Sequence, residues 1–237
     1  MIATRLDRSP PFERGITLGD FLVPIRVGER IGAGLRHLVL IILGALLIVG
    51  GAYASTKVAP IAIPGLYVPV PGTPVPFSLQ TFAVLFTGAT LGFRRGLAST
   101  GVYLLWGIVG LPVFALKSDG TRAGLNTIIS SSEGHIVLGS TGGYLIGFLL
   151  AAAIAGALAE HGWDRNLRSS VAAMLVASAA IYAIGLPWLA IALKVDATQT
   201  LDWGLYPFIP GDVIKLLVAA GLLPVGWWFV RRRALDL

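Results

Sequence analysis

Six apolar runs, separated by polar or proline-rich segments, constrain the fold of this chain more than any other feature. They cover residues 37–55, 77–92, 96–116, 141–159, 170–193 and 211–230. An α-helix needs about 20 apolar residues to cross a bilayer, and five of the runs come close to that length. We expect the short run 77–92 to be tilted, or to continue as a helix through Phe93. The sequence therefore predicts an all-α, polytopic membrane protein with six transmembrane helices.

Composition supports this class and excludes several functions. Only 13% of the 237 residues are charged and the mean hydropathy is +0.80, whereas soluble domains carry about 25% charged residues. The net charge of +6 lies in short clusters between the apolar runs, which argues against nucleic acid as a partner. Without cysteine, the chain has neither disulfides nor thiol nucleophiles. Its three histidines lack metal-ligand spacing and it has no P-loop, so we expect no metal, no cofactor and no ATP hydrolysis by a P-loop.

Three segments follow from the positions of the runs. Residues 1–36 form a polar tail rich in arginine, with a short surface helix expected near Ile16–Leu22. Residues 37–231 form the membrane domain and 232–237 a short C-terminal tail. The first run resembles a signal peptide, but its charged leader is too long, so we interpret it as a retained helix. The segment 57–76 contains six prolines and predicts an irregular connection that packs against the helices.

Basic residues predict the orientation. With six helices and the N-terminus inside, the inner segments hold thirteen Arg and Lys residues and the outer segments hold four. Cytoplasmic segments of membrane proteins carry the excess of Lys and Arg. Both termini are therefore expected in the cytoplasm of a multi-pass protein of the cell membrane.

Two opposite charges open the last run, which places them on the outer side. Asp212 and Lys215 lie three residues apart, so a helix places them on one face. Ionisable groups at membrane depth commonly mark a binding or transport site. Two structural alternatives stay open: Asp212 can cap the helix, and Lys215 can extend its amine to the headgroups.

Five stretches together resemble one family: residues 75–85, 92–96, 110–114, 141–148 and 207–215, the last reading PFIPGDVIK. In this order they are similar to the biotin-specific substrate-binding component of energy-coupling factor transporters. The resemblance spans residues 40–224. It implies a six-helix protein that binds biotin from outside with high affinity. It further implies a separate transmembrane coupling protein and two cytoplasmic ATPases as partners, and polar ligand contacts from Asp212 and Lys215.

The chemistry of biotin suits these residues. Its ureido group has two N–H donors and one carbonyl acceptor, which need partners when they leave water. Asp212 can accept from an N–H, and Lys215 can donate to the carbonyl or to Asp212. Phe77, Tyr144 and Trp106 are candidate walls for the apolar bicycle. Gln80 either lines the pocket or caps its helix.

Several alternatives remain at this point. Glu133 and His135, in the loop 117–140, are either ligand contacts or exposed loop residues. The glycines at 142 and 143 permit close approach of a ligand or, more commonly in membranes, of a neighbouring helix. A component for another vitamin differs only in pocket detail. A membrane-embedded enzyme would need an acid, base or nucleophile cluster, and the pair Asp212 and Lys215 offers little support for one.

Overall fold

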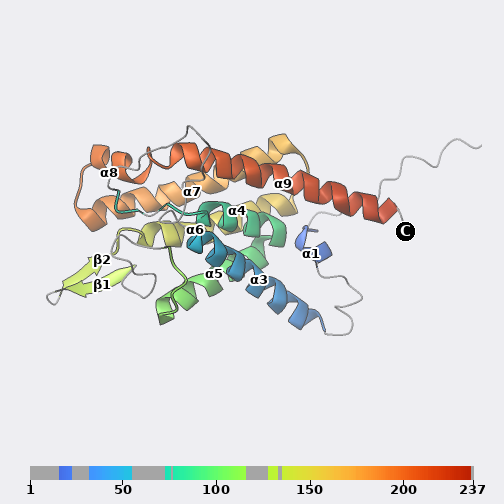
Figure 1. Cartoon of the computed structure of the whole chain (residues 1–237), viewed down its shortest axis with the longest axis horizontal. Coiled ribbons are helices and arrows are strands. Elements are labelled where there is room, and N and C mark those ends of the chain that lie inside the picture. Colours follow the sequence, from blue (N-terminus) through green and yellow to red (C-terminus); the bar gives the residue numbers. More distant parts are fainter. Residues whose placement is uncertain are drawn as a thin grey trace, which may run out of the picture.

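The computed structural model describes residues 16–22, 32–54, 73–75, 77–115, 128–132 and 135–235. Its elements are α1 (Gly19–Leu22), α3 (Ala33–Tyr53), α4 (Gln80–Leu91), α5 (Phe93–Val109), β1 (Ile129–Ser132), β2 (His135–Leu138), α6 (Gly142–Glu160), α7 (Leu167–Leu193), α8 (Ala197–Gly204) and α9 (Ile209–Leu235). The long helices run side by side as a bundle, with α8 and the two strands near one end and α1 near the other (Figure 1). The predicted helical class is confirmed, and each of the six apolar runs overlaps one helix.

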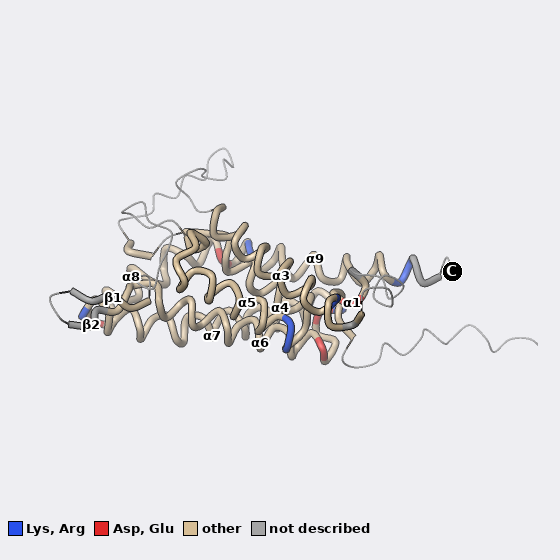
Figure 2. Tube along the Cα trace, turned by 90° about the horizontal axis from the view of Figure 1, so that it is seen from below, with Lys and Arg blue, Asp and Glu red and all other residues tan. Residues whose placement is uncertain are grey.

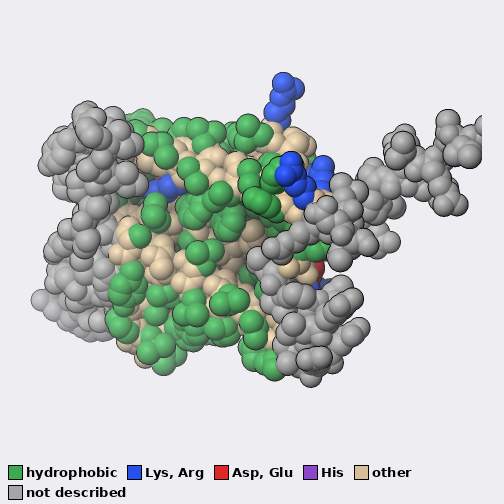
Figure 3. Space-filling model, turned by 45° about the vertical axis from the view of Figure 1, so that its right-hand side comes forward, with side chains coloured by type: hydrophobic (Ala, Val, Ile, Leu, Met, Phe, Trp, Pro, Cys, Tyr) green, Lys and Arg blue, Asp and Glu red, His purple; other side chains and the backbone are tan. Residues whose placement is uncertain are grey.

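Within the part of the chain that the structure describes, four helices are long and apolar enough to cross a membrane: Gly34–Tyr53, Gly142–Glu160, Leu167–Leu193 and Ile209–Arg232. The helix α4 has only 12 residues, about 18 Å of rise, and α5 has 17. Apolar side chains cover much of the described surface in Figure 3, as expected for a bundle that faces lipid. These features define a membrane protein.

The chain turns sharply between α4 and α5, so of the two alternatives for the run 77–92, continuation as one helix through Phe93 is wrong. Gly92 ends α4 with a φ of 84°, a conformation that favours glycine, and α5 begins at the next residue. A Cβ atom built on Gly96 would lie 2.8 Å from the Cα of Gly88. In one continuous helix these residues would be about 12 Å apart. The two helices therefore form a tight hairpin.

Small residues let the helices of the bundle approach closely. The helix α6 packs against α4, α5 and α7. A Cβ on Gly88 would lie 2.5 Å from the carbonyl oxygen of Ala152, and one on Gly147 would lie 2.9 Å from the Cα of Ile181. A Cβ on Gly143 would clash with Trp188 at 2.2 Å. Helix packing is therefore the role of Gly143, as membrane helices commonly use glycine.

Basic residues gather at one end of the bundle. Those that the structure describes there begin α3, α5 and α7 or end α9: Arg36, Arg94, Arg95, Arg165, Arg168, Arg231 and Arg232. Charged residues are sparse along most of the bundle (Figure 2). We call this the arginine-rich end. The opposite end, where α4, α6 and α9 begin, is the pocket end.

Three elements differ from the sequence-based expectations. Part of the loop 117–140 forms an antiparallel hairpin, in which Ile129 pairs with Leu138 and Ser132 with His135. The helix α8 was not expected; Asp196 begins it by accepting a hydrogen bond from the Gln199 amide at 2.8 Å. The short helix predicted near Ile16–Leu22 is present as α1, but Thr17 and Leu18 before it are buried against the bundle rather than lying on the surface.

Candidate functional site

At the end of the bundle opposite the arginines, a pocket lies between α4, α6, α7 and α9. Its lining residues are mostly apolar and aromatic, with polar groups from each of the four helices: Val75, Ser78, Gln80, Thr81, Phe114, Ala115, Thr141, Tyr144, Leu145, Phe148, Ile181, Tyr182, Phe208, Asp212 and Lys215. Small-molecule sites in proteins commonly combine apolar walls with a few converging polar groups. The pocket therefore has the composition of a site for a small, largely apolar ligand.

Asp212 lies in the first turn of α9 and is the polar centre of the pocket. Lys215 donates to its Oδ1 at 2.9 Å, and the hydroxyl of Tyr182, from α7, donates to its Oδ2. The side chains of Asp212 and Lys215 are 13% and 11% exposed. Neither structural alternative matches this geometry, since the carboxylate bonds to side chains instead of capping the helix, and the lysine is folded inward instead of extending to the headgroups.

Aromatic rings surround this charged pair. Phe77 stacks on Phe208 with ring centroids 4.5 Å apart, and the Nζ of Lys215 lies 5.7 Å from the Phe77 ring centroid. Phe77 is thus a support for Phe208 and Lys215 rather than one of the lining residues. Tyr144 contacts Tyr182 edge to face at 6.2 Å and donates to the carbonyl oxygen of Gly204 at 2.9 Å.

Gln80 begins α4 and lines the pocket, with its side chain buried. Its amide nitrogen donates to the hydroxyl of Tyr103, and its Oε1 accepts from the hydroxyl of Ser78 at 3.1 Å. The capping alternative does not hold, because Leu79 occupies the cap position and no side chain bonds there. The amide is held between α5 and the segment that precedes α4.

The structure brings four of the five predicted site residues to the pocket wall, Gln80, Tyr144, Asp212 and Lys215, and places Phe77 behind them. Trp106, the other candidate wall, packs against the core from α5 instead. Glu133 lies outside the described residues, and the side chain of His135 is likewise not described. Among the described residues, no group of three or more His, Cys, Asp or Glu side chains could hold a metal ion.

The main residue that sequence reasoning missed is Tyr182. It sits within an apolar run, 30 residues before Asp212, and no local motif marks it. Phe208 and Thr141 were inside the recognised stretches but were not singled out. Which polar groups of α7 face α9 depends on how the two helices pack, and neither segment encodes that by itself.

The membrane-spanning bundle, with a pocket of aromatic, apolar and polar side chains at one end, defines an integral membrane protein. The sequence model of the BioY family matches residues 25–232. The chain belongs to the BioY family.

Two curated relatives agree. The biotin transporter BioY of Thermotoga maritima is 36% identical over 158 residues, which cover 66% of this chain and 83% of the relative. That of Rhodobacter capsulatus is 33% identical over 178 residues, or 71% of this chain and 85% of the relative. Among solved structures, the S-component for biotin from an ECF-type ABC transporter superposes with a TM-score of 0.63. It is 22% identical and covers 81% of this chain and 90% of that one. At that identity the match supports the fold.

Proposed function

We propose that this protein is the biotin-binding membrane component of an energy-coupling factor transporter and serves biotin uptake. The observation that carries the proposal is the pair Asp212 and Lys215, which lies in an apolar pocket of a chain of the BioY family. The curated relatives are transporters, which removes the support for a membrane-embedded enzyme.

The pocket supplies partners for each part of biotin. Each carboxylate oxygen of Asp212 already accepts one hydrogen bond and has a second lone pair for a ureido N–H. Lys215 uses one of its three N–H donors on Asp212, which leaves donors for the ureido carbonyl or the valerate carboxylate. Tyr144, Phe148 and Phe208 provide apolar walls for the bicycle. These contacts would make the pocket selective for biotin.

Ligand access requires side chains at the pocket to move. The cavity has a volume of about 60 Å³, whereas ligand pockets commonly measure about 300–1,000 Å³. Phe208 and Lys215 line the cavity, and Phe77 supports both from behind. Displacement of Phe208 and Lys215 would enlarge the cavity, because both side chains line it.

The orientation completes the proposal. The arginine-rich end faces the cytoplasm and the pocket end faces the medium, which gives six crossings, a membrane domain at 37–231 and cytoplasmic tails at 1–36 and 232–237. Support comes from the arginines at the end opposite the pocket, as expected in the plasma membrane. A reporter fused after Leu237 should be cytoplasmic and one inserted after Gly139 should be outside. An external C-terminal reporter would contradict the six-helix topology.

A coupling protein and two ATPases complete the transporter. The chain carries no P-loop, so a separate transmembrane coupling protein and two cytoplasmic ATPases would supply the energy. The purified chain should show no ATPase activity, and ATP-driven uptake should require the added subunits. Hydrolysis of ATP by the isolated chain, free of contaminants, would refute this arrangement.

Direct binding tests the proposed function most simply. Labelled biotin should bind the purified protein in detergent or nanodiscs with one site per chain, and unlabelled biotin should displace it. Riboflavin and thiamine should not compete. Displacement by either of these vitamins in preference to biotin would assign the pocket to a different vitamin.

A further inference from the structure

Tyr182 joins two helices through the polar centre of the pocket. It projects from α7 and donates its hydroxyl hydrogen to Oδ2 of Asp212 on α9, while Lys215 donates to Oδ1. The two donors therefore hold opposite oxygens of one carboxylate. Lys215 is on the same helix as Asp212, three residues away, so Tyr182 provides the contact that fixes Asp212 relative to another helix.

The surroundings of Tyr182 make it a stiff support. Its ring meets Tyr144 edge to face, 6.2 Å between centroids at 88°. Tyr144 is in turn held by its bond to the Gly204 carbonyl, and a Cβ on Gly185, one turn beyond Tyr182, would lie 2.6 Å from the Tyr144 ring. A tyrosine has two side-chain torsions, whereas Lys215 reaches Asp212 through a flexible four-carbon stem. Of the two donors to Asp212, Tyr182 is therefore the one with the less flexible side chain.

This arrangement also fixes what the carboxylate offers to a ligand. Because both of its oxygens already receive a donor, Asp212 presents acceptor lone pairs to the pocket and no hydrogen of its own. A ligand N–H placed there is satisfied. A carbonyl or an alkylated nitrogen would instead face an anionic acceptor without a partner.

We propose that Tyr182 is a positioning residue for ligand recognition, which orients Asp212 so that its free lone pairs select a ligand carrying an N–H donor. The proposal rests on the proposed function, since the ureido group of biotin is the donor in question. Tyr182 acts through Asp212, and the loss of its hydroxyl has consequences only while the Asp212 carboxylate is present.

A double-mutant cycle tests this dependence. Tyr182→Phe keeps the ring and removes the hydroxyl, and we expect labelled biotin to bind about five- to twentyfold more weakly. In the Asp212→Ala background the same substitution should change affinity less than twofold. An equal loss in both backgrounds would mean that Tyr182 acts on packing alone. Unchanged or tighter binding by Tyr182→Phe would overturn the proposal outright.

Selectivity gives a second readout. A biotin derivative methylated on a ureido nitrogen should bind wild-type protein much more weakly than biotin, and Tyr182→Phe should reduce that preference several-fold. An undiminished preference in Tyr182→Phe would contradict the orienting role. Tyr53→Phe is the matched control, because its exposed hydroxyl donates to the Pro112 carbonyl and neither residue lines the pocket. If wild-type protein fails to bind biotin, the proposed function fails, whereas binding that is indifferent to Tyr182 refutes only this inference.

Discussion

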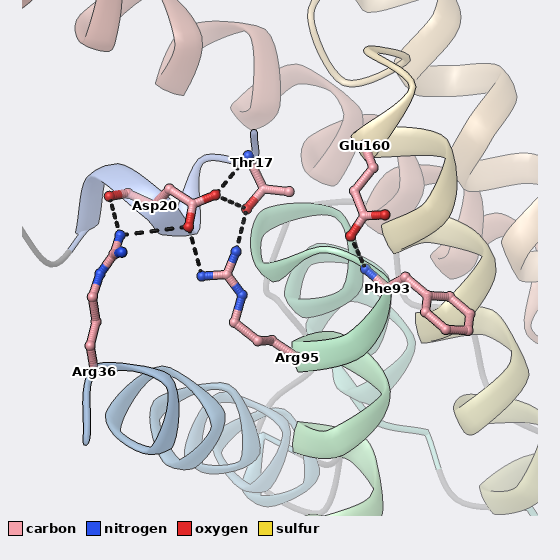
Figure 4. A network of polar contacts seen from close by, with 6 residues as sticks. All are labelled: Thr17, Asp20, Arg36, Phe93, Arg95 and Glu160. Carbon is pink, nitrogen blue, oxygen red and sulfur yellow. Dashed lines mark hydrogen bonds and ion pairs between the residues drawn. The ribbon is translucent and has the colours of Figure 1, made fainter. Parts of the chain in front are cut away.

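Each end of the molecule has an aspartate that accepts from several donors, but the two aspartates lie in different surroundings. At the arginine-rich end, Asp20 of α1 pairs with Arg95 at 2.9 Å and with Arg36 at 3.6 Å, and it accepts from the amide of Thr17 at 3.0 Å (Figure 4). At the pocket end, Asp212 accepts from Lys215 and Tyr182. Each carboxylate bridges donors from different parts of the chain.

The surroundings separate their roles. Asp20 connects α1 to α3 and α5, and the neighbouring backbone is tightly packed, because a Cβ on Gly19 would lie 2.8 Å from the Thr90 carbonyl oxygen. Asp212 lines a pocket. Asp20 also precedes residue 25, where the family match begins, whereas Asp212 lies inside it. The Asp20 pair therefore joins three helices, whereas Asp212 lies in the wall of the pocket that holds the predicted site residues.

The largest expected effect is on ligand affinity at the pocket end. Asp212→Ala and Lys215→Met should each insert normally and bind biotin at least tenfold more weakly. A hydrogen bond to a charged group contributes about 1.5–3 kcal/mol, which is roughly ten- to a hundredfold or more in affinity. Asp212→Asn, which still accepts, should fall between wild type and Asp212→Ala. Wild-type affinity in a properly inserted Lys215→Met protein would refute the site.

A smaller effect, on stability alone, is expected at the arginine-rich end. Asp20→Ala leaves two partly buried guanidinium groups without their carboxylate and should lower the free energy of unfolding by about 1–2 kcal/mol. Biotin affinity should not change, because the pocket is at the other end. Chemical denaturation and binding of one sample measure both quantities. Asp202→Ala, which removes an exposed carboxylate, is the control. A tenfold loss of biotin affinity in Asp20→Ala would contradict the claim that Asp20 contributes to stability alone.

The contribution of Asp20 should depend on pH. Burial by itself raises the pKa of Asp20, but hydrogen bonds from Arg95 and Thr17 and the charge of Arg95 outweigh it and hold this pKa below its usual value. The stabilisation is therefore present above the ordinary carboxyl pKa of about 3.9 and is lost as the pH falls through the lower folded value. The difference between wild type and Asp20→Ala should shrink in that acidic range.

Asp164 should show the opposite pH dependence, with an amplitude of about 2–3 kcal/mol, since each unit of pKa difference corresponds to about 1.4 kcal/mol. Burial raises the pKa of this carboxyl to about 6, although Trp227 donates to its Oδ2 at 2.5 Å. Because the folded state holds the proton more tightly, stability should fall as the pH rises from about 4 to 6. Asp164→Asn keeps an acceptor for Trp227 and should remove this slope in denaturation measured across that range. If Asp164→Asn kept the wild-type slope, another group would be the cause of this pH dependence.

The smallest effect should come from the aromatic support of the pocket. Phe77→Leu removes the stack on Phe208 and the ring beneath Lys215, which together contribute about 0.5–1 kcal/mol. Biotin should bind roughly two- to fivefold more weakly in equilibrium titrations. Phe229→Leu, on the exposed surface of α9, should bind as wild type does. If both variants bound biotin equally well, Phe77 would have no role in supporting the site.

The sequence by itself determined the helical class, the positions of the long helices and the shared face of Asp212 and Lys215. Hydropathy and helical spacing are local properties, so the runs predicted as 141–159 and 170–193 appear as α6 (Gly142–Glu160) and α7 (Leu167–Leu193). The family likewise followed from short stretches read in order.

Only the tertiary structure decided which distant groups meet. Tyr182 reaches Asp212, Gln80 reaches Tyr103, and Phe77 stacks on Phe208 because of how the helices cross, and no periodicity within one helix encodes that geometry. The tightness of the turn between the runs 77–92 and 96–116 depends likewise on a single residue, because Gly92 adopts a left-handed conformation and α5 begins directly after it.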